Sequence, residues 1–315
     1  MGVLFNHHEA GIEDAQLATD IIGGIRFGTH WSCLSGVNHA TTRCHDVYFT
    51  WGEHDSNIVV ASKSIAPHIL IVGSFLSEFT NVVEKERARL AVDVMRNRGV
   101  EYVIALFDTS HPTPKYLKYF LDWLFRDPQL GLVIKPKSPI EEVIEKNHLV
   151  EPYRRAVSTG RIFAMADTAP PGDAGEIADY AVGVAGISAV VTAALRGAKI
   201  LFLDYEGLSK SVQEPFDVLH SLGEKRCVFY DELSLEQAVV EQNINPQLNI
   251  CLGDVSPILN KIDPFRDGLA SSRIGEYVKW YLTVKDSGLC REESLEIATQ
   301  KYSEKWGADK VVSKW

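Results

Sequence analysis

The sequence predicts an α/β protein built on parallel sheet, and three observations support this prediction. Apolar, strand-like runs alternate with amphipathic, helix-like segments over much of the chain. The strand-like runs are apolar throughout, as at 102–107, which is typical of parallel strands covered by helices on both faces. The chain has 315 residues and is 45% hydrophobic, so it can bury a large core. Together these features predict a parallel sheet wrapped by helices.

The first part of the chain is the least regular. A helix is expected at 13–22, because two glycines follow it as a stop signal. Short strands are expected at 46–52 and at 68–74. A strong helix is expected at 84–99, with Leu90, Val94 and Met95 on its core face and a glycine as its C-cap.

From residue 101 the alternation becomes regular. Strands are expected at 101–108, 130–135, 160–166, 179–185, 198–204 and 227–231. Helices are expected at 116–127, 140–149, 187–197, 234–244, 271–282 and 291–306. Because parallel strands are joined by right-handed crossovers, their carboxyl ends and any ligand should meet along one edge of the sheet.

Small, polar and basic residues follow several of these strands, and they are the candidate ligand-binding residues. Glycine lets the backbone approach a ligand closely, and the start of a helix offers N–H groups and a positive dipole end to a phosphate. Lysine adds a point charge. The candidate binding residues at this edge are Asp108, Thr109, Lys135, Lys137, Gly186, Ile187, Ser188 and Asp204.

Each of these residues also has an ordinary structural interpretation. A serine at a helix start is commonly only an N-cap, a lysine at a strand end is commonly only a solvated charge, and Asp204 could cap the next helix. The phosphate-binding loop of nucleotide triphosphatases is absent, and GVAGIS at 183–188 lacks the spacing of a dinucleotide dehydrogenase.

The candidate catalytic residues come from the N-terminal part. Glu9 is the first candidate for the base or nucleophile, with His8 and His30 next, because carboxylates and imidazoles are the usual general bases. Arg26 could bind an anionic substrate or pair with a neighbouring carboxylate. No metal is expected, since His7-His8-Glu9 lacks the histidine spacing of a zinc helix.

Composition excludes several classes of protein. A net charge of −10 argues against a nucleic-acid surface. The five cysteines form no C-x-x-C pair, which disfavours a disulfide framework or a zinc site and fits a reducing cytoplasm. No apolar run approaches the roughly 20 residues that span a bilayer, and the first residues do not read as a signal peptide.

The segment from 130 to 204 resembles the donor-binding half of GT-B glycosyltransferases of bacterial surface-polysaccharide synthesis. Its Lys-Pro-Lys-Ser-Pro at 135–139 is similar to a Lys-Pro-His-Pro turn in those enzymes, and 178–199 is similar to their small-residue turn with a serine. The segments 46–55 and 263–282 also resemble parts of these proteins. The resemblance implies two Rossmann-like domains, with the two turns holding the nucleotide phosphates.

This sequence departs from the family pattern in three ways. Lys137 stands in place of the usual histidine, and Thr192 stands where many retaining members that use uridine or guanosine donors carry a glutamate. The missing glutamate weakens the case for uridine and guanosine donors, whereas the missing histidine leaves the donor open. The Lys-Pro and Ser turns are similar to those of transferases that use cytidine monophosphate sugars, so such a sugar is the expected donor. The part before the linking helix has about 75 residues, whereas such a domain usually has well over about 100. The N-terminal domain is therefore expected to be reduced, or to be the remainder of a longer one.

The expected domains are 1–80, the acceptor-side remainder; 81–255, the donor-binding domain; and 256–315, C-terminal helices packing back. The expected function is a cytoplasmic, metal-independent glycosyltransferase that uses a nucleotide sugar as co-substrate, without a cofactor. Its acceptor would be a glycan or a lipid-linked glycan, and peripheral association with the inner membrane face is compatible with this function. The alternatives are a nucleotide-sugar epimerase, a polyol-phosphate transferase, or a non-catalytic scaffold that binds nucleotide or glycan.

Overall fold

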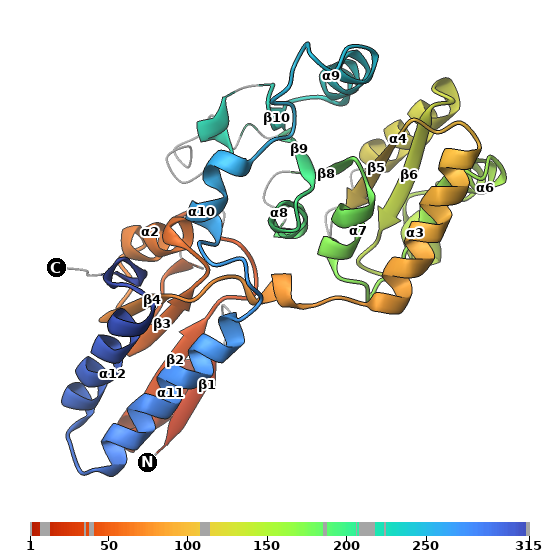
Figure 1. Ribbon diagram of the computed structural model, residues 1–315. Coiled ribbons are helices and arrows are strands. Elements are labelled where there is room, and N and C mark those ends of the chain that lie inside the picture. Colours follow the sequence, from red (N-terminus) through yellow and green to blue (C-terminus); the bar gives the residue numbers. More distant parts are fainter. Residues whose placement is uncertain are drawn as a thin grey trace. The chain divides into compact units, whose positions relative to one another are not determined.

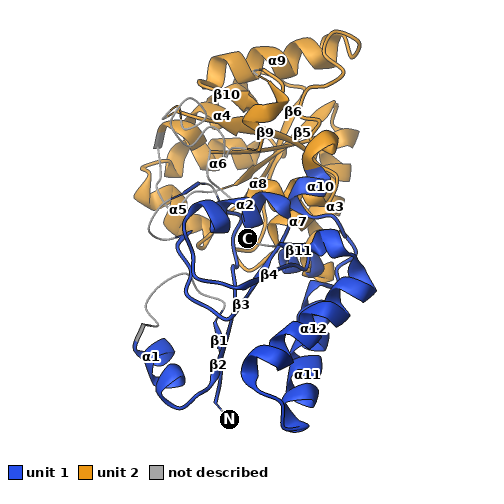
Figure 2. Cartoon of the chain, turned by 90° about the vertical axis from the view of Figure 1, so that its left-hand side faces the viewer, with its two compact units in different colours: residues 1–78, 259–315 blue, residues 79–258 orange. Residues whose placement is uncertain are grey.

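The computed structural model divides into two compact units (Figures 1 and 2). Unit 1 comprises residues 1–78 and 259–315, and unit 2 comprises residues 79–258. The structure describes residues 2–6, 13–34, 36–37, 41–107, 114–184, 188–205, 207, 218–223 and 225–312. The C-terminal helices, expected as a third region, lie within unit 1.

Unit 1 is built on a sheet with the strand order β1-β2-β3-β4-β11. Its strands are β1 (Val3–Asn6), β2 (Ile25–Thr29), β3 (Val47–Thr50), β4 (His68–Ile71) and β11 (Val311–Val312). The first four are parallel, and β11 runs antiparallel to β4. Its helices are α1 (Glu13–Ile21), α2 (Glu53–Ala61), α10 (Leu259–Ile262), α11 (Ala270–Asp286) and α12 (Arg291–Trp306).

Aromatic side chains of α11 and α12 cover one face of this sheet. Tyr277, Tyr281 and Tyr302 are fully buried against alternate residues of β2, β3 and β4. Trp280 and Trp306 pack at the margin of the same core. The alternation follows from the pleat, which directs every second side chain of a strand to one face. The aromatic residues of these two helices thus form much of the unit 1 core.

Unit 2 is built on a sheet with the strand order β10-β9-β8-β5-β6-β7, in which every pair is parallel. Its strands are β5 (Tyr102–Phe107), β6 (Leu130–Lys135), β7 (Ile162–Ala164), β8 (Tyr180–Val184), β9 (Lys199–Leu203) and β10 (Val228–Phe229). Counted from the first strand of unit 2, this is the order 3-2-1-4-5-6 of a doubly wound nucleotide-binding sheet. The predicted α/β fold is confirmed.

Helices cover both faces of the unit 2 sheet. They are α3 (Val82–Asn97), α4 (Pro114–Arg126), α5 (Ile140–Lys146), α6 (Val150–Ser158), α7 (Pro171–Ile177), α8 (Ser188–Leu195) and α9 (Glu232–Ile244). Side chains of α4 and α9 share one core cluster with alternate residues of the central strands. Helices α3, α7 and α8 pack with one another on the other face (Figure 1).

The core face of α3 differs from the one expected from the sequence. Met95 is buried, but its buried partners are Ala88 and Val92. Leu90 is 60% exposed and Val94 is 49% exposed, so placing them on the core face is wrong. The buried residues follow spacings of four and three, which keep side chains on one side of a helix, whereas Leu90 and Met95 are five residues apart.

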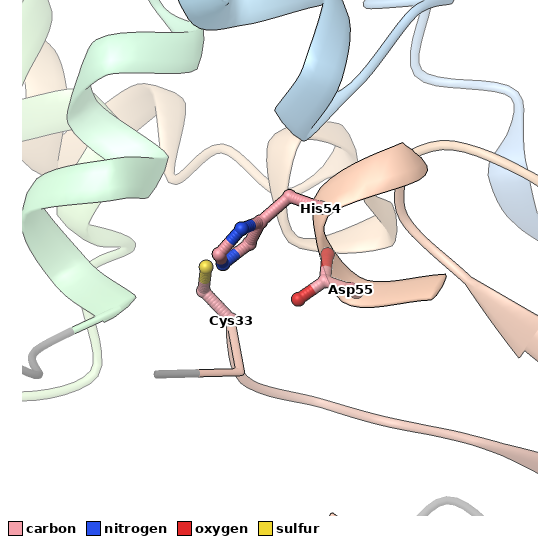
Figure 3. A group of neighbouring side chains, drawn as sticks. All are labelled: Cys33, His54 and Asp55. Atoms are coloured by element: carbon pink, nitrogen blue, oxygen red, sulfur yellow. The ribbon is translucent and has the colours of Figure 1, made fainter. Parts of the chain in front are cut away.

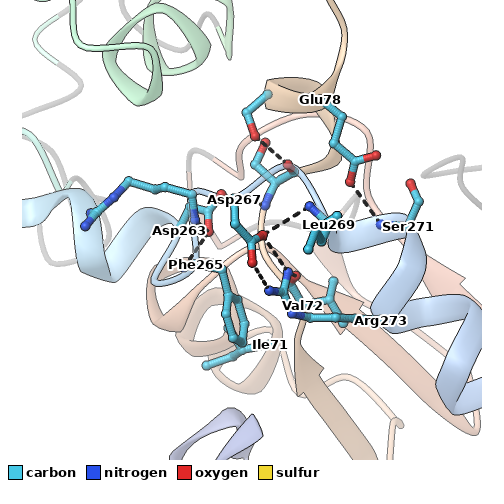
Figure 4. A network of polar contacts seen from close by, with 12 residues as sticks. Ile71, Val72, Glu78, Asp263, Phe265, Asp267, Leu269, Ser271 and Arg273 are labelled. Carbon is cyan, nitrogen blue, oxygen red and sulfur yellow. Dashed lines mark hydrogen bonds and ion pairs between the residues drawn. The ribbon is translucent and has the colours of Figure 1, made fainter.

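A buried polar network holds the chain where it leaves unit 1 to the chain where it returns (Figure 4). Asp263 is 1% exposed, and its Oδ2 accepts the backbone N–H of Ser74 at 2.9 Å. Its Oδ1 accepts the backbone N–H groups of Phe265 at 2.9 Å and Arg266 at 3.0 Å. One carboxylate thus satisfies three amides that have no strand to pair with.

Arg273 completes this network from α11. The guanidinium donates from Nη1 to the carbonyl oxygen of Val72 at 3.1 Å, and it forms a two-pronged ion pair with Asp267. Its Cζ lies 3.6 Å from the ring centroid of Phe265. A planar guanidinium fits these contacts, which an ammonium could not make together.

Unit 1 also contains a buried histidine that its surroundings keep neutral. His45 is 3% exposed, and its ring packs so closely on Gly28 that a Cβ there would lie 2.6 Å from it. Neither ring nitrogen has a hydrogen-bond partner among the described residues. Burial, and then the charges of Arg43 and Arg26, lower the pKa of His45 from 6.5 to about 4.

This histidine predicts that acid weakens unit 1. The unfolded chain binds a proton near pH 6.5 but the folded chain only near pH 4, so stability is complete above pH 6.5 and falls as the pH approaches 4. Burial also lowers the pKa of His68, which acts in the same direction. The unfolding free energy of the wild-type protein should fall between pH 7.5 and pH 4.5. We expect this fall to be about 2 kcal/mol smaller in His45→Leu, measured by urea denaturation at both pH values.

The variant also has a control at neutral pH. Because both ring nitrogens of His45 lack partners, His45→Leu should be close to wild type in stability at pH 7.5. The same loss between the two pH values in variant and wild type would show that His45 does not cause the acid sensitivity.

Candidate functional site

The candidate site lies at the carboxyl edge of the unit 2 sheet. Strands β5 and β8 are neighbours there, but the chain continues from β5 toward β6 on one side and from β8 toward β9 on the other. The two following connections therefore diverge at this point of the sheet. In open parallel sheets this is the topological switch point, where ligands bind outside the strand ends.

Lys135 stands at this edge as the last residue of β6, in register with Phe107 of β5. Its side chain is 6% exposed, and its ammonium donates to the carbonyl oxygens of Pro136 and of Asp167, the latter at 2.9 Å. The charge thus joins the loops that follow β6 and β7. It raises the local positive potential and also holds the turn in place.

Lys137 and Ser188, also expected at the phosphate site, are both more accessible than Lys135. Lys137 is exposed two residues beyond β6. Ser188 is the first residue of α8 and is partly buried. Thr192 is 1% exposed and donates its hydroxyl to the carbonyl oxygen of Ser188 at 3.0 Å. It therefore stabilises the first turn of α8.

Asp204 follows β9 and is 2% exposed. Its backbone N–H donates to the carbonyl oxygen of Phe229 at 2.7 Å, which extends the pairing of β9 with β10. Its own carbonyl oxygen accepts the N–H of Gly207 at 3.3 Å. This backbone position fixes the acid at the end of the strand.

A polar cluster near this edge was not anticipated from the sequence. The hydroxyl of Tyr205 donates to Glu232 Oε1 at 2.9 Å, and Lys115 Nζ lies 3.6 Å from Glu232 Oε2. Burial, and then the bond to Glu232, raise the pKa of Tyr205. The sequence offered one signal for this cluster, which is the acid Glu232 at the start of the helix that follows the strand at 228–229. An acid at a helix start is usually explained by the helix dipole alone.

Several predicted site residues lie outside the described residues. They are His8, Glu9, Asp108, Thr109, Gly186 and Ile187.

Arg26 lies near the start of β2, at the end of the strand opposite to its carboxyl edge. Its guanidinium is 3.0 Å from Asp20 Oδ2 and 3.4 Å from Asp46 Oδ1. Asp46 also accepts the backbone N–H of Arg26 at 2.7 Å. Of the two roles expected for Arg26, the structure shows pairing with neighbouring carboxylates.

His30 is fully buried between the ends of β2 and β3. Its Nδ1 lies 2.7 Å from the carbonyl oxygen of Ser32, and its Nε2 accepts the backbone N–H of Trp51 at 3.2 Å. The ring also stacks on the indole of Trp51, with 5.2 Å between centroids. Both nitrogens are engaged with backbone groups, so this conformation offers no nitrogen to a substrate.

Comparison with solved structures identifies the architecture. The chain has the GT-B fold. The alignment with HepE from Anabaena, solved with UDP and glucose, covers 88% of this chain and 77% of the HepE chain, with a TM-score of 0.53 and 12% sequence identity. The alignment with a putative UDP-N-acetylglucosamine 2-epimerase from Listeria monocytogenes covers 89% of this chain and 73% of the epimerase chain, with a TM-score of 0.57 and 11% sequence identity.

The alignment with the wall teichoic acid polymerase TagF, in a structure with CDPG, covers 90% of this chain and 73% of the TagF chain, with a TM-score of 0.57 and 11% sequence identity. At these identities the likeness establishes the fold. No family model matches the sequence, and no curated protein matches it. Among the described residues, no helix has the length and apolarity to cross a membrane.

The GT-B fold depends locally on close packing between β8 and α8. A Cβ on Gly183 would lie 2.3 Å from Cγ2 of Val190, which is itself fully buried. Only a glycine therefore lets α8 lie at its present distance from the strand. Ser188, the serine of the expected phosphate site, is the first residue of α8, so this packing also positions that serine.

We expect Gly183→Ala to destabilise the protein by about 1–3 kcal/mol, because the added methyl group overpacks a filled core. Val190→Ala removes the opposing methyl group and should relieve this clash. The double variant should therefore be less destabilised than the sum of the two single variants by about 1 kcal/mol, measured by urea denaturation of all four proteins. Simple additivity would show that this contact does not set the position of α8.

Proposed function

We propose that this chain transfers a sugar from a nucleotide donor to a glycan or lipid-linked glycan acceptor. The observation that carries the proposal is the unit 2 sheet, whose switch point is flanked by a Lys-Pro-Lys turn and by the start of α8. The GT-B fold supports it, since HepE of that fold was solved with UDP and with UDP-glucose. Surface-polysaccharide synthesis is the proposed setting.

The proposed chemistry rests on positioning and charge. The nucleotide phosphates would lie near Lys137 and the N-terminus of α8, where Ser188 adds a hydroxyl donor. Donors already in place at the departing phosphate stabilise the charge that develops as the glycosidic bond breaks. We propose that these protein groups fulfil this role without a metal.

The exposed lysine gives the first test. We expect the wild-type protein to bind at least one of CMP, CDP, UDP and GDP, and Lys137→Ala to weaken that binding about fivefold to tenfold, by loss of a charge-assisted contact. Lys146→Ala removes an exposed lysine from the last turn of α5 and serves as the matched control. Calorimetric titration measures both effects.

Two results of this titration would contradict the proposal. If none of the four nucleotides binds the wild-type protein, unit 2 is not a nucleotide site. If the two lysine variants lose affinity equally, the phosphates are not held at the turn after β6. Preference among the bases also tests the expectation of a cytidine donor, since CMP should then bind more tightly than UDP.

The base that activates the acceptor is proposed to be Glu9, with His8 as the second candidate. Glu9→Gln keeps the size of the side chain but abolishes its basicity. We expect it to lower the transfer rate by a factor of about 10²–10⁴ and to leave nucleotide affinity unchanged. Glu296→Gln, at an exposed position of α12, is the control. Full activity in Glu9→Gln would rule out Glu9 as the base.

Two other functions fit the same fold. An epimerase and TagF, a polymerase solved with CDPG, are among the similar structures, so an epimerase or a polyol-phosphate transferase is the second candidate. Product analysis separates them: an epimerase releases an isomeric nucleotide sugar without an acceptor. A scaffold that only binds nucleotide or glycan would retain its function in Glu9→Gln.

A further inference from the structure

Three side chains that can bind a metal gather at the carboxyl edge of the unit 1 sheet (Figure 3). Cys33 belongs to the segment that follows β2, and His54 and Asp55 lie in the first turn of α2, which follows β3. One ligand atom from each residue lies within 4.8 Å of the other two. The group arises because β2 and β3 are parallel neighbours, so the segments after them meet.

The backbone of Leu34 holds this group together. Its N–H donates to Asp55 Oδ1 at 2.9 Å, and its carbonyl oxygen lies 2.9 Å from His54 Nε2. Cys33 Sγ lies 3.7 Å from the same carbonyl oxygen. His54 and Asp55 of α2 thus both hydrogen-bond to the backbone of Leu34. These two bonds bring the Cys33 thiol beside the imidazole and the carboxylate.

The hydrogen bonds to Leu34 leave the second carboxylate oxygen of Asp55 without a role. Asp55 is fully buried, and its Oδ2 has no hydrogen-bond partner among the residues that the structure describes. A buried carboxylate oxygen that has lost its water without gaining a partner is costly. A cation held by the three residues would remove this cost.

We propose that Cys33, His54 and Asp55 bind a divalent metal ion of the zinc class. Thiolate, imidazole and carboxylate are the ligands that zinc takes in proteins, whereas a thiolate is a poor ligand for magnesium or calcium. Three protein ligands leave one position open for water. On binding, the Cys33 thiol gives up its proton to solvent.

This proposal departs from the expectation that the chain has no metal site. That expectation rested on ligand spacing along the sequence, and no local motif joins residue 33 to residues 54–55. The site would be independent of nucleotide binding by unit 2, so failure of either proposal leaves the other standing.

Zinc analysis and cysteine labelling test the proposal on the tag-free, full-length protein. We expect one equivalent of zinc per chain to remain after dialysis, and Co²⁺ to give the charge-transfer absorption of a cobalt–thiolate bond. Zinc should protect Cys33 from iodoacetamide, read by peptide mass spectrometry. The exposed Cys290 should label equally with and without zinc, which gives an internal control.

Variants assign the ligands. Cys33→Ser should abolish the cobalt–thiolate band, and Cys290→Ser should leave it unchanged. Asp55→Asn keeps an oxygen that can accept the Leu34 N–H but removes the charge, so it should bind zinc about tenfold more weakly or worse. Melting curves without metal show whether each variant is folded, and the labelling of wild-type Cys33 does not depend on any variant.

Three results would overturn the proposal. The first is a wild-type protein that retains no zinc after dialysis. The second is zinc that remains bound in Cys33→Ser but is lost in the double variant His7→Ala and His8→Ala, which would place it at the N-terminal histidines. The third is labelling of Cys33 at the same rate with and without zinc, which would leave Cys33, His54 and Asp55 as a loop clamp only.

Discussion

Parallel strand pairing is the constraint on which the rest of this structure depends. Because parallel neighbours run in the same direction, their carboxyl ends and the segments that follow them emerge at one edge of the sheet. In unit 2 this brings the turn after Lys135 and the start of α8 at Ser188 to the same edge. In unit 1 it brings Cys33 to His54. Both proposed sites are consequences of the same pairing rule.

Several buried charges in this protein hold backbone and hydroxyl groups. Asp263 accepts three amides, and Asp173, which is fully buried, accepts the Thr80 hydroxyl and the Asn81 amide at 2.7 Å each. Lys135 donates to two carbonyl oxygens. A loop beside a buried sheet edge has amides and carbonyls without strand partners, and a charged side chain satisfies them strongly. Ligand chemistry is then left to more accessible groups such as Lys137.

The strands of unit 2 were predictable because their apolar runs are continuous and end in clear turn residues. The helix expected at 140–149 is α5, which ends at Lys146, and both α6 and α7 were missed. The sequence of α7, PGDAGEI, opens with Pro-Gly, which reads as a turn. The face of α3 was wrong because Met95, which is buried, does not share a helical spacing with Leu90, and both Leu90 and Val94 lie on the exposed side. The polar cluster of Tyr205 with Glu232 and the group around Asp55 each join residues separated along the chain, so neither could be seen in a local pattern.

By itself, the sequence determined the alternation of strands and helices, the parallel character of the sheets and the edge at which their carboxyl ends meet. These properties follow from local periodicity and from the handedness of crossovers, which act along the chain. Only the tertiary structure decided which charged or polar side chains already pair with other protein groups and are therefore not available to a ligand. Arg26 was placed between two acids and His30 between two strand ends, because burial and pairing depend on neighbours that are distant in sequence.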